Sequence, residues 1–178
     1  MMNKRLGIEF FSRDVLQVAP DMVGKSLIRV FDDGNIYQAI ITETEAYRGE
    51  EDLACHASKG RTARTEIMYQ HGGHIYVYLI YGMYWMLNVV TENEGIPQAV
   101  LIRGIQGFNG PGKLTRHLNI DKSFYGENLI SSSRLYVTNG IQNASLKISK
   151  RIGIDYAGEI WGNKLWRYTL NNNLMQLK

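Results

Sequence analysis

The pattern of hydrophobic and polar residues predicts a chain built mostly from short strands. Apolar and polar positions alternate with a period of two in segments rich in β-branched and aromatic residues, which is typical of strands. The segments 26–31 and 36–47 flank the turn DDGN and predict a β-hairpin in which Gly34 can adopt a positive φ. The other expected strands are 74–80, 86–90, 98–104, 131–139, 145–154 and 159–170.

Helical signals are few and short. Ser12 is a suitable N-cap for a helix that runs to about Ala19 and is ended by Pro20. Residues 65–70 could form one or two helical turns, and the Gly-Pro pair at 110–111 leads into a helix over about 111–120. A mixed α/β fold is therefore expected.

The segment 40–56 carries an unusual concentration of reactive groups. Its strand alternation places Glu43, Glu45 and Tyr47 on one face, and His56 follows within a short loop. If that face is buried, at least one carboxylate must be paired, hydrogen-bonded or shifted in pKa, because an isolated buried charge is too costly. The alternative is an edge strand whose glutamates are solvated.

A second unusual feature is the turn between the strands 74–80 and 86–90. It contains Tyr81, Gly82, Met83 and Tyr84, although turns are normally made of Asn, Asp, Gly or Pro. Large apolar groups at an exposed tip are typical of a binding surface. The alternative is a tip that folds back on the core.

Composition and charge narrow the class of protein. A chain of 178 residues with 44% hydrophobic residues fits one globular domain, 1–178. The apolar runs are too short to span a bilayer, and the N-terminal residues do not have the pattern expected of a signal peptide. The lone Cys55 excludes an internal disulfide and indicates a reducing compartment. The net charge of +3 favours a polyanionic partner only weakly.

The residues that could carry chemistry point to hydrolysis without a metal or cofactor. His71 and His74 do not have a zinc-binding spacing, and neither a nucleophile elbow nor a phosphate-binding glycine loop is present. What remains is a glutamate accompanied by Arg103, a histidine and several tyrosines. A carboxylate can take a proton from an attacking water while aromatic faces hold a flat leaving group, such as a nucleobase.

Several motifs in this order and spacing resemble the single-domain alkyladenine (3-methyladenine, or methylpurine) DNA glycosylases. The resemblance covers nearly the whole chain and implies a curved, largely antiparallel sheet, similar to the open barrel of formyltransferase C-terminal domains, with a protruding β-hairpin. The matching motifs are ETEAYRGEEDLACH (43–56), GRTARTEIMY (60–69), YVYLIYGMYWMLNV (76–89), VLIRG (100–104), GPGKL (110–114) and RIGIDYAGE (151–159).

The resemblance implies roles for individual residues in catalysis and in holding the base. Glu45 matches the general base that activates water, and Arg103 and the backbone of Ile152 match the groups that hold that water. The base pocket corresponds to Tyr47, His56 and Tyr78, which stack on or hydrogen-bond a flipped nucleotide.

Selectivity and DNA contacts are implied in the same way. Asn88 matches the residue that excludes normal guanine by a clash with its 2-amino group. Tyr81 matches the side chain inserted into the minor groove. Further DNA contacts correspond to Met83, Tyr84, Thr62, Arg64 and Lys122.

The implied activity is excision of alkylated or deaminated purines from double-stranded DNA, which starts base excision repair, by an intracellular monomer that acts on genomic DNA. The absence of a lysine near Glu45 predicts a monofunctional enzyme with water as the nucleophile. Thr65 departs from the asparagine often found in the family, and the loops after Arg103 and around Ser131 are short. A rival hypothesis is a non-catalytic module that binds nucleic acid through its tyrosine-rich face.

Overall fold

The sheet is organised around one long strand, β2 (Ile36–Arg48). In the computed structural model, which describes residues 4–171, the first part of β2 pairs with β1 (Ser26–Val30). The second part has a neighbour on each edge, β5 (Gln98–Ile105) and β9 (Arg167–Leu170). The expected hairpin of 26–31 and 36–47 is confirmed, and Gly34 has φ 84°.

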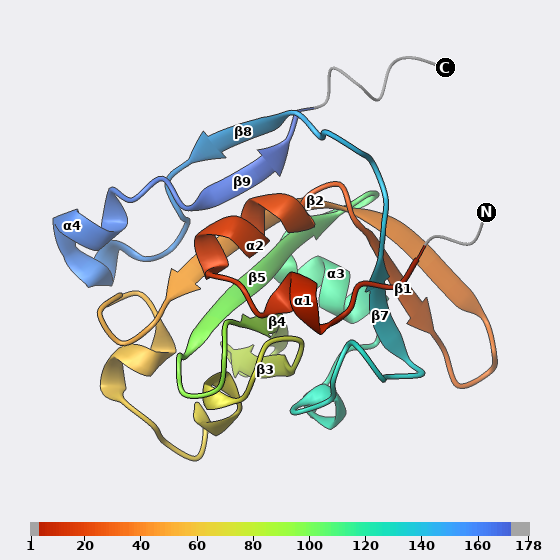
Figure 1. Ribbon diagram of the computed structural model, residues 1–178, viewed down its shortest axis with the longest axis horizontal. Coiled ribbons are helices and arrows are strands. Elements are labelled where there is room, and N and C mark those ends of the chain that lie inside the picture. Colours follow the sequence, from red (N-terminus) through yellow and green to blue (C-terminus); the bar gives the residue numbers. More distant parts are fainter. Residues whose placement is uncertain (1–3, 172–178) are drawn as a thin grey trace.

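Within residues 4–171, nine strands form one sheet that does not close on itself (Figure 1). Its main path runs β3-β4-β5-β2-β1-β7, and every pairing among the described strands is antiparallel. The likeness to formyltransferase C-terminal domains stays a prediction. The remaining strands are β3 (Ile75–Ile80), β4 (Tyr84–Thr91), β6 (Phe108–Asn109), β7 (Leu135–Thr138) and β8 (Leu146–Ser149).

Helices are short and complete a mixed α/β fold. The α-helices are α1 (Ile8–Phe11), α2 (Val15–Met22), α3 (Pro111–His117) and α4 (Gly158–Gly162). The 3₁₀ turns are η1 (His56–Lys59), η2 (Glu66–Tyr69), η3 (Lys122–Phe124) and η4 (Asp155–Ala157). The turns expected at 65–70 and the helix expected after Gly110 are thereby confirmed.

The first predicted helix differs from expectation at both ends. Asp14, not Ser12, caps α2, because its side chain accepts a hydrogen bond from the Leu16 N–H at 2.9 Å. Pro20 lies inside the helix instead of ending it. The proline removes one helical hydrogen bond, and complete burial of Met22 in the last turn offsets that loss.

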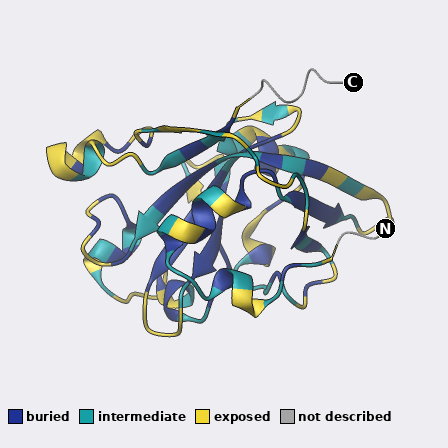
Figure 2. Ribbon diagram, turned by 45° about the horizontal axis from the view of Figure 1, so that its top comes forward, coloured by how far each residue is buried: buried dark blue, intermediate teal, exposed yellow. Residues whose placement is uncertain are grey.

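The strand expected over 159–170 is wrong in its first half. Residues 158–162 form α4, and only Arg167–Leu170 pair as a strand. An extended segment needs a neighbouring strand to bind its backbone N–H and C=O groups. On this side β2 pairs only through Glu43, Thr44 and Glu45, so the earlier residues of the segment have no strand beside them. α4 contains no buried residue, and Figure 2 shows it as an exposed projection of the molecule.

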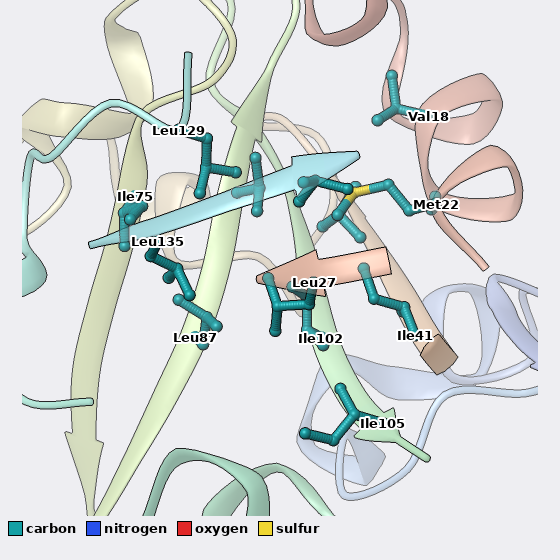
Figure 3. Packing of buried hydrophobic residues seen from close by; sticks show 14 of the residues in the cluster. Val18, Met22, Leu27, Ile41, Ile75, Leu87, Ile102, Ile105, Leu129 and Leu135 are labelled. Carbon is teal, nitrogen blue, oxygen red and sulfur yellow. The ribbon is translucent and has the colours of Figure 1, made fainter. Parts of the chain in front are cut away.

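The main hydrophobic core joins the sheet to α2 (Figure 3). Val18 and Met22 of α2 meet Leu27, Ile41 and other strand residues, all of them almost inaccessible to solvent. This packing occupies one face of β2 and β5. The opposite face of the same strands borders a cavity.

Candidate active site

A cavity of about 550 Å³ lies beside β2, β4 and β5. Its walls include the aromatic side chains of Tyr47, Tyr76 and Tyr78 and the polar groups of His56 and Asn88. A concave site lined mainly by aromatic groups with a few polar ones is the usual form of a site for a flat ligand.

Glu45 lies directly behind this cavity and is fully buried. Its carboxylate accepts hydrogen bonds from the Tyr47 hydroxyl and from the Ile152 backbone N–H, each at 2.8 Å. The Nε atom of Arg103 lies 3.5 Å from Oε1. Burial raises the pKa of Glu45, and these three neighbours oppose that rise. The solvated-edge alternative is wrong, because β2 is paired on both edges at Glu45.

A double irregularity in the β2–β5 pairing brings Arg103 to this carboxylate. The register shifts around Glu43, so that Thr42 on β2 and Arg103 on β5 have no directly opposed partner. A bulge of this kind redirects a side chain and is common beside active sites. Gly104 permits the close approach, since a Cβ atom there would lie 2.9 Å from Thr42 Oγ1.

Glu43 contacts two arginines and not the cavity. It accepts hydrogen bonds from Arg103 Nε at 3.2 Å and from Arg167 Nη1 at 3.0 Å. The arrangement fixes Arg103 between the two glutamates. Glu43 therefore holds a cation in place, while Glu45 lies behind the cavity.

The aromatic wall is held together by a histidine. His56 Nδ1 lies 2.8 Å from the Tyr76 hydroxyl, and its ring meets Tyr78 edge-on at 4.5 Å. Burial, followed by the positive charges of Arg64 and Lys59, lowers the pKa of His56 to about 4. His56 is therefore neutral near pH 7 and can both donate and accept a hydrogen bond.

Asn88 is buried in the cavity wall and is fixed by its own strand pair. Its amide nitrogen donates to the carbonyls of Tyr76 at 3.2 Å and Met86 at 3.3 Å. A side chain held in this way cannot swing aside for a bulkier ligand.

The hairpin tip extends into solvent, so the alternative of a tip folded on the core is wrong. Tyr81 is 84% exposed and Met83 is 60% exposed. Tyr81 and Gly82 have φ values of 51° and 67°, as the two central residues of a type I′ turn do. A tyrosine rarely adopts this conformation, and here it also borders the cavity mouth.

The other predicted DNA contacts lie in three places. Thr62 and Arg64 border the cavity, and the Arg64 guanidinium lies 5.1 Å from the centre of the Tyr78 ring. The Tyr84 ring lies against α3, where a Cβ atom on Gly112 would come within 2.6 Å of it. Lys122 is exposed at the start of η3, away from the cavity wall.

Sequence reasoning missed four residues that contribute to the site. Tyr76 shares a strand face with Tyr78, and that spacing could have identified it. Tyr156 borders the cavity although it is 71% exposed. Asp52 and Arg151 form a buried ion pair, and nothing in their local sequence indicates burial.

Other chemistries find no support in the part of the chain that the structure describes. No three His, Cys, Asp or Glu side chains there converge as metal ligands. Burial raises the pKa of Cys55 to about 12, which keeps the thiol protonated and poorly nucleophilic. Among residues 4–171 there is also no helix with the length and apolar character needed to cross a membrane.

The fold and the cavity together define a class of enzyme. A buried carboxylate, held by a backbone N–H beside an arginine and placed behind an aromatic cavity, is an arrangement suited to an enzyme that hydrolyses a bond to a flat substrate. A projecting aromatic side chain at the cavity mouth adds a feature of proteins that distort the DNA minor groove.

The chain belongs to the methylpurine-DNA glycosylase (MPG) family, whose sequence model matches residues 9–109 and 106–174. A candidate 3-methyladenine DNA glycosylase of Natranaerobius thermophilus is 40% identical, with 95% of this chain and 96% of the relative covered. Similar relatives occur in Borreliella burgdorferi (45% identical; 92% and 95% covered) and Methanocella arvoryzae (43% identical; 93% and 92% covered). The expected family is thus confirmed, and with it a hydrolase acting on N-glycosidic bonds of alkylated purines in DNA, in base excision repair.

Proposed function

We propose that this protein is a monofunctional glycosylase that flips a damaged purine out of duplex DNA and releases it by attack of water at C1′. The substrates are alkylated or deaminated purines of the 3-methyladenine, 7-methylguanine, hypoxanthine and ethenoadenine class. One observation carries the proposal. Glu45 is a fully buried carboxylate with a backbone N–H at 2.8 Å, directly behind an aromatic cavity.

In the proposed reaction Glu45 accepts a proton from a water molecule as the water oxygen forms a bond to C1′. The electron pair of the N-glycosidic bond moves onto the departing purine. A cationic purine such as 3-methyladenine leaves as the neutral base, and a neutral purine such as hypoxanthine leaves as an anion that takes a proton from water. Arg103 and the N–H of Ile152 orient the water and keep Glu45 ionised. No amine of the protein forms a covalent intermediate, so the DNA strand stays uncut.

Stacking and exclusion account for the choice of base. Tyr47 and Tyr78 hold the flat purine, and an alkylated, positively charged ring is favoured by about 1 kcal/mol or more once water is excluded. Neutral His56 hydrogen-bonds the base or the adjoining sugar-phosphate. Asn88 rejects guanine by a steric clash with its 2-amino group.

The proposed DNA interface surrounds the cavity mouth. Tyr81 enters the minor groove and fills the gap left by the flipped nucleotide, which offsets an unstacking cost of a few kcal/mol. Met83 and Tyr84 line the same groove, while Thr62, Arg64 and Lys122 contact phosphates. The protein acts as a monomer on genomic DNA.

Release of hypoxanthine from a duplex containing one inosine tests this function directly. Wild type should release the base, and Glu45→Gln should lower the rate by at least about 100-fold, because amides do not accept the proton. Binding of the same duplex, measured by fluorescence anisotropy, should change little.

The neighbouring variant Glu43→Gln is the matched control, since it removes a carboxylate that does not face the cavity. It should keep measurable base release. Turnover by Glu45→Gln at the wild-type rate would contradict the assigned role. Tight binding by wild type without release of any damaged purine would favour a non-catalytic nucleic-acid-binding module.

A further inference from the structure

A buried ion pair joins two loops that are far apart in the sequence. Arg151 and Asp52 make a two-pronged contact, with Nη1 at 2.5 Å from Oδ2 and Nη2 at 2.9 Å from Oδ1. Neither side chain is accessible to solvent. Bidentate pairs of this kind fix relative orientation as well as distance.

The pair also holds the backbone around it. Arg151 Nη1 donates to the Ala46 carbonyl of β2 at 2.9 Å. Asp52 accepts hydrogen bonds from the N–H groups of Arg48 at 3.0 Å and Ala54 at 3.1 Å. Three segments therefore meet at one ion pair: the end of β2, the loop leading to η1, and the loop that begins at Arg151.

The residue after Arg151 is Ile152, whose N–H binds Glu45. The Ile152 side chain is 48% exposed and Gly153 is also exposed, with φ 74°. The buried residues that flank them are Arg151 on one side and Ile154, which packs against Ala54 and Ala157, on the other. The Arg151 guanidinium additionally lies 4.9 Å from the centre of the Tyr47 ring, and the Tyr47 hydroxyl is the second donor to Glu45. Both donors to the Glu45 carboxylate, the Ile152 N–H and the Tyr47 hydroxyl, are thus adjacent to Arg151 and to its ion pair with Asp52.

Stability alone is a weak reason for such a pair. Burying two charges costs several kcal/mol per ion before their attraction is counted, and well-packed apolar residues often stabilise a fold at least as well. The Nε atom of Arg151 is buried without a hydrogen-bond partner among the described residues, which adds to the cost. Unlike an apolar contact, a two-pronged ion pair fixes the direction of the backbone to which its side chains are attached.

We propose that Asp52 and Arg151 form a positioning pair, which aims the Ile152 N–H at Glu45 Oε1 and thereby sets the ionisation of the catalytic carboxylate. This inference deepens the proposed function and rests on it, because Glu45 is catalytic only if the protein is the proposed glycosylase. The contact to Glu45 itself is a property of the folded protein and can be measured without DNA.

The other groups that face Glu45 define what must stay constant in a test. They are Arg103 of β5, the neighbouring Glu43 and Tyr47 of β2, Tyr78 of β3 and Tyr156 of η4, with Arg167 of β9 bound to Glu43. The Ile152 N–H favours the ionised carboxylate, so its loss should move the pKa of Glu45 further upward.

Titration of the Glu45 side-chain carboxyl by ¹³C NMR, in the full chain without DNA, measures this effect. Arg151→Lys keeps the charge but loses the two-pronged contact, and Asp52→Asn keeps the shape but loses the charge. Both should raise the titration midpoint by on the order of one pH unit. An unchanged midpoint in the folded variants would overturn the proposal.

Arg134→Lys is the matched control. Arg134 forms an ion pair with Glu127 at 2.5 Å, outside the cavity, so the variant should lose stability without shifting the Glu45 midpoint. An equal shift in this control would assign the effect to general loosening and reject the proposal.

Hydrogen exchange of the wild-type protein needs no variant and covers the case in which both variants fail to fold. The Ile152 amide should exchange slowly, although its side chain is half-exposed, because it donates to a buried carboxylate. Exchange as fast as that of the backbone amide of Gln142, an exposed residue in a turn, would contradict the proposal.

Base release then separates this inference from the proposed function. The folded variants should lose about ten- to a hundredfold in kcat at neutral pH, with the acid limb moved to higher pH and binding of a lesion duplex within about twofold of wild type. If wild type releases no base, the proposed function is refuted. The NMR titration still tests whether the Asp52–Arg151 pair positions the Ile152 N–H against Glu45.

Discussion

At the scale of single residues, Glu45 is governed by two opposed effects. Burial disfavours its charge, while Arg103 and the donors Ile152 and Tyr47 favour it. Burial prevails, and the pKa rises. A carboxylate with a raised pKa is a stronger base than one in water, which suits proton abstraction.

The same imbalance predicts that Glu45→Gln stabilises the fold near pH 7. A raised pKa means that the folded state holds the proton more tightly than the unfolded state does, so wild-type stability falls as the pH rises through the window between the two pKa values. The amide removes this loss, which amounts to about 1.4 kcal/mol for each pH unit that separates the folded and unfolded pKa values. Thermal unfolding should show a higher Tm for the variant at pH 7 and a smaller difference near pH 4.5.

Glu43→Gln serves as the control in the unfolding experiment. It breaks contacts to Arg103 and Arg167 and should not raise the Tm. A Glu45→Gln variant that is less stable than wild type at pH 7 would show that the ionised carboxylate stabilises the fold.

Asn88→Ser should relax selectivity. Serine removes the amide that is fixed by the carbonyls of Tyr76 and Met86, which leaves room for a 2-amino group. Release of normal guanine from an undamaged duplex should rise about tenfold, the effect of roughly 1.4 kcal/mol. Release of 3-methyladenine is the internal reference, and an unchanged ratio of the two rates would remove the steric argument.

At the scale of elements, the β3–β4 hairpin ends in a strained turn. Tyr81 occupies a left-handed conformation that costs about 1–2 kcal/mol for a residue with a Cβ atom. Asn or Gly would fit the same turn without that cost. Tyr81 therefore does not stabilise the hairpin, and what it contributes is an exposed aromatic side chain at the hairpin tip.

Tyr81→Ser should weaken binding to a lesion duplex by about ten- to a hundredfold, because stacking of an inserted ring contributes about 1–3 kcal/mol. Anisotropy titrations at constant salt measure this change. Leu79→Ser is the control, since Leu79 is an exposed apolar residue of the same hairpin that does not border the cavity. Equal losses in both variants would argue against a specific wedge.

At the scale of the whole molecule, separate parts of the chain set the charge state of the cavity. The proposed reaction requires an ionised Glu45, so the excision rate should rise with pH through the raised pKa of Glu45 and then level off. His56, with a pKa of about 4, and Tyr76, with a pKa of about 12, keep one state from pH 5 to pH 9.

Excision of 3-methyladenine should therefore show a single acid limb, because this charged base needs no proton in order to leave. Single-turnover rates between pH 5 and pH 9, at fixed ionic strength, provide the measurement. A second limb that falls between pH 7 and pH 9 would reveal a general acid, a role for which neither His56 nor Tyr76 has a suitable pKa.

The sequence alone determined most of the strands, the two hairpins and the family, because strand periodicity and turn chemistry are local and the motifs are contiguous. It also brought out Glu45, Tyr47 and Tyr81 as unusual for their positions. Predictions from the sequence were wrong where local signals competed. Asp14, and not Ser12, is the N-cap of α2. The segment before β9 forms the helix α4, because β2 offers it no strand to pair with.

Strand alternation places Glu43 and Glu45 on the same face, and the family resemblance pointed to Glu45, but only the tertiary structure decided how the surroundings of the two glutamates differ. The difference depends on a register shift between β2 and β5, which aims Arg103 between the two carboxylates, and on burial that no local pattern encodes. Tertiary structure likewise joined Asp52 to Arg151, which are 99 positions apart. Contacts across such separations arise from how the loops pack against the sheet, so the sequence supplied the groups and the fold supplied their geometry.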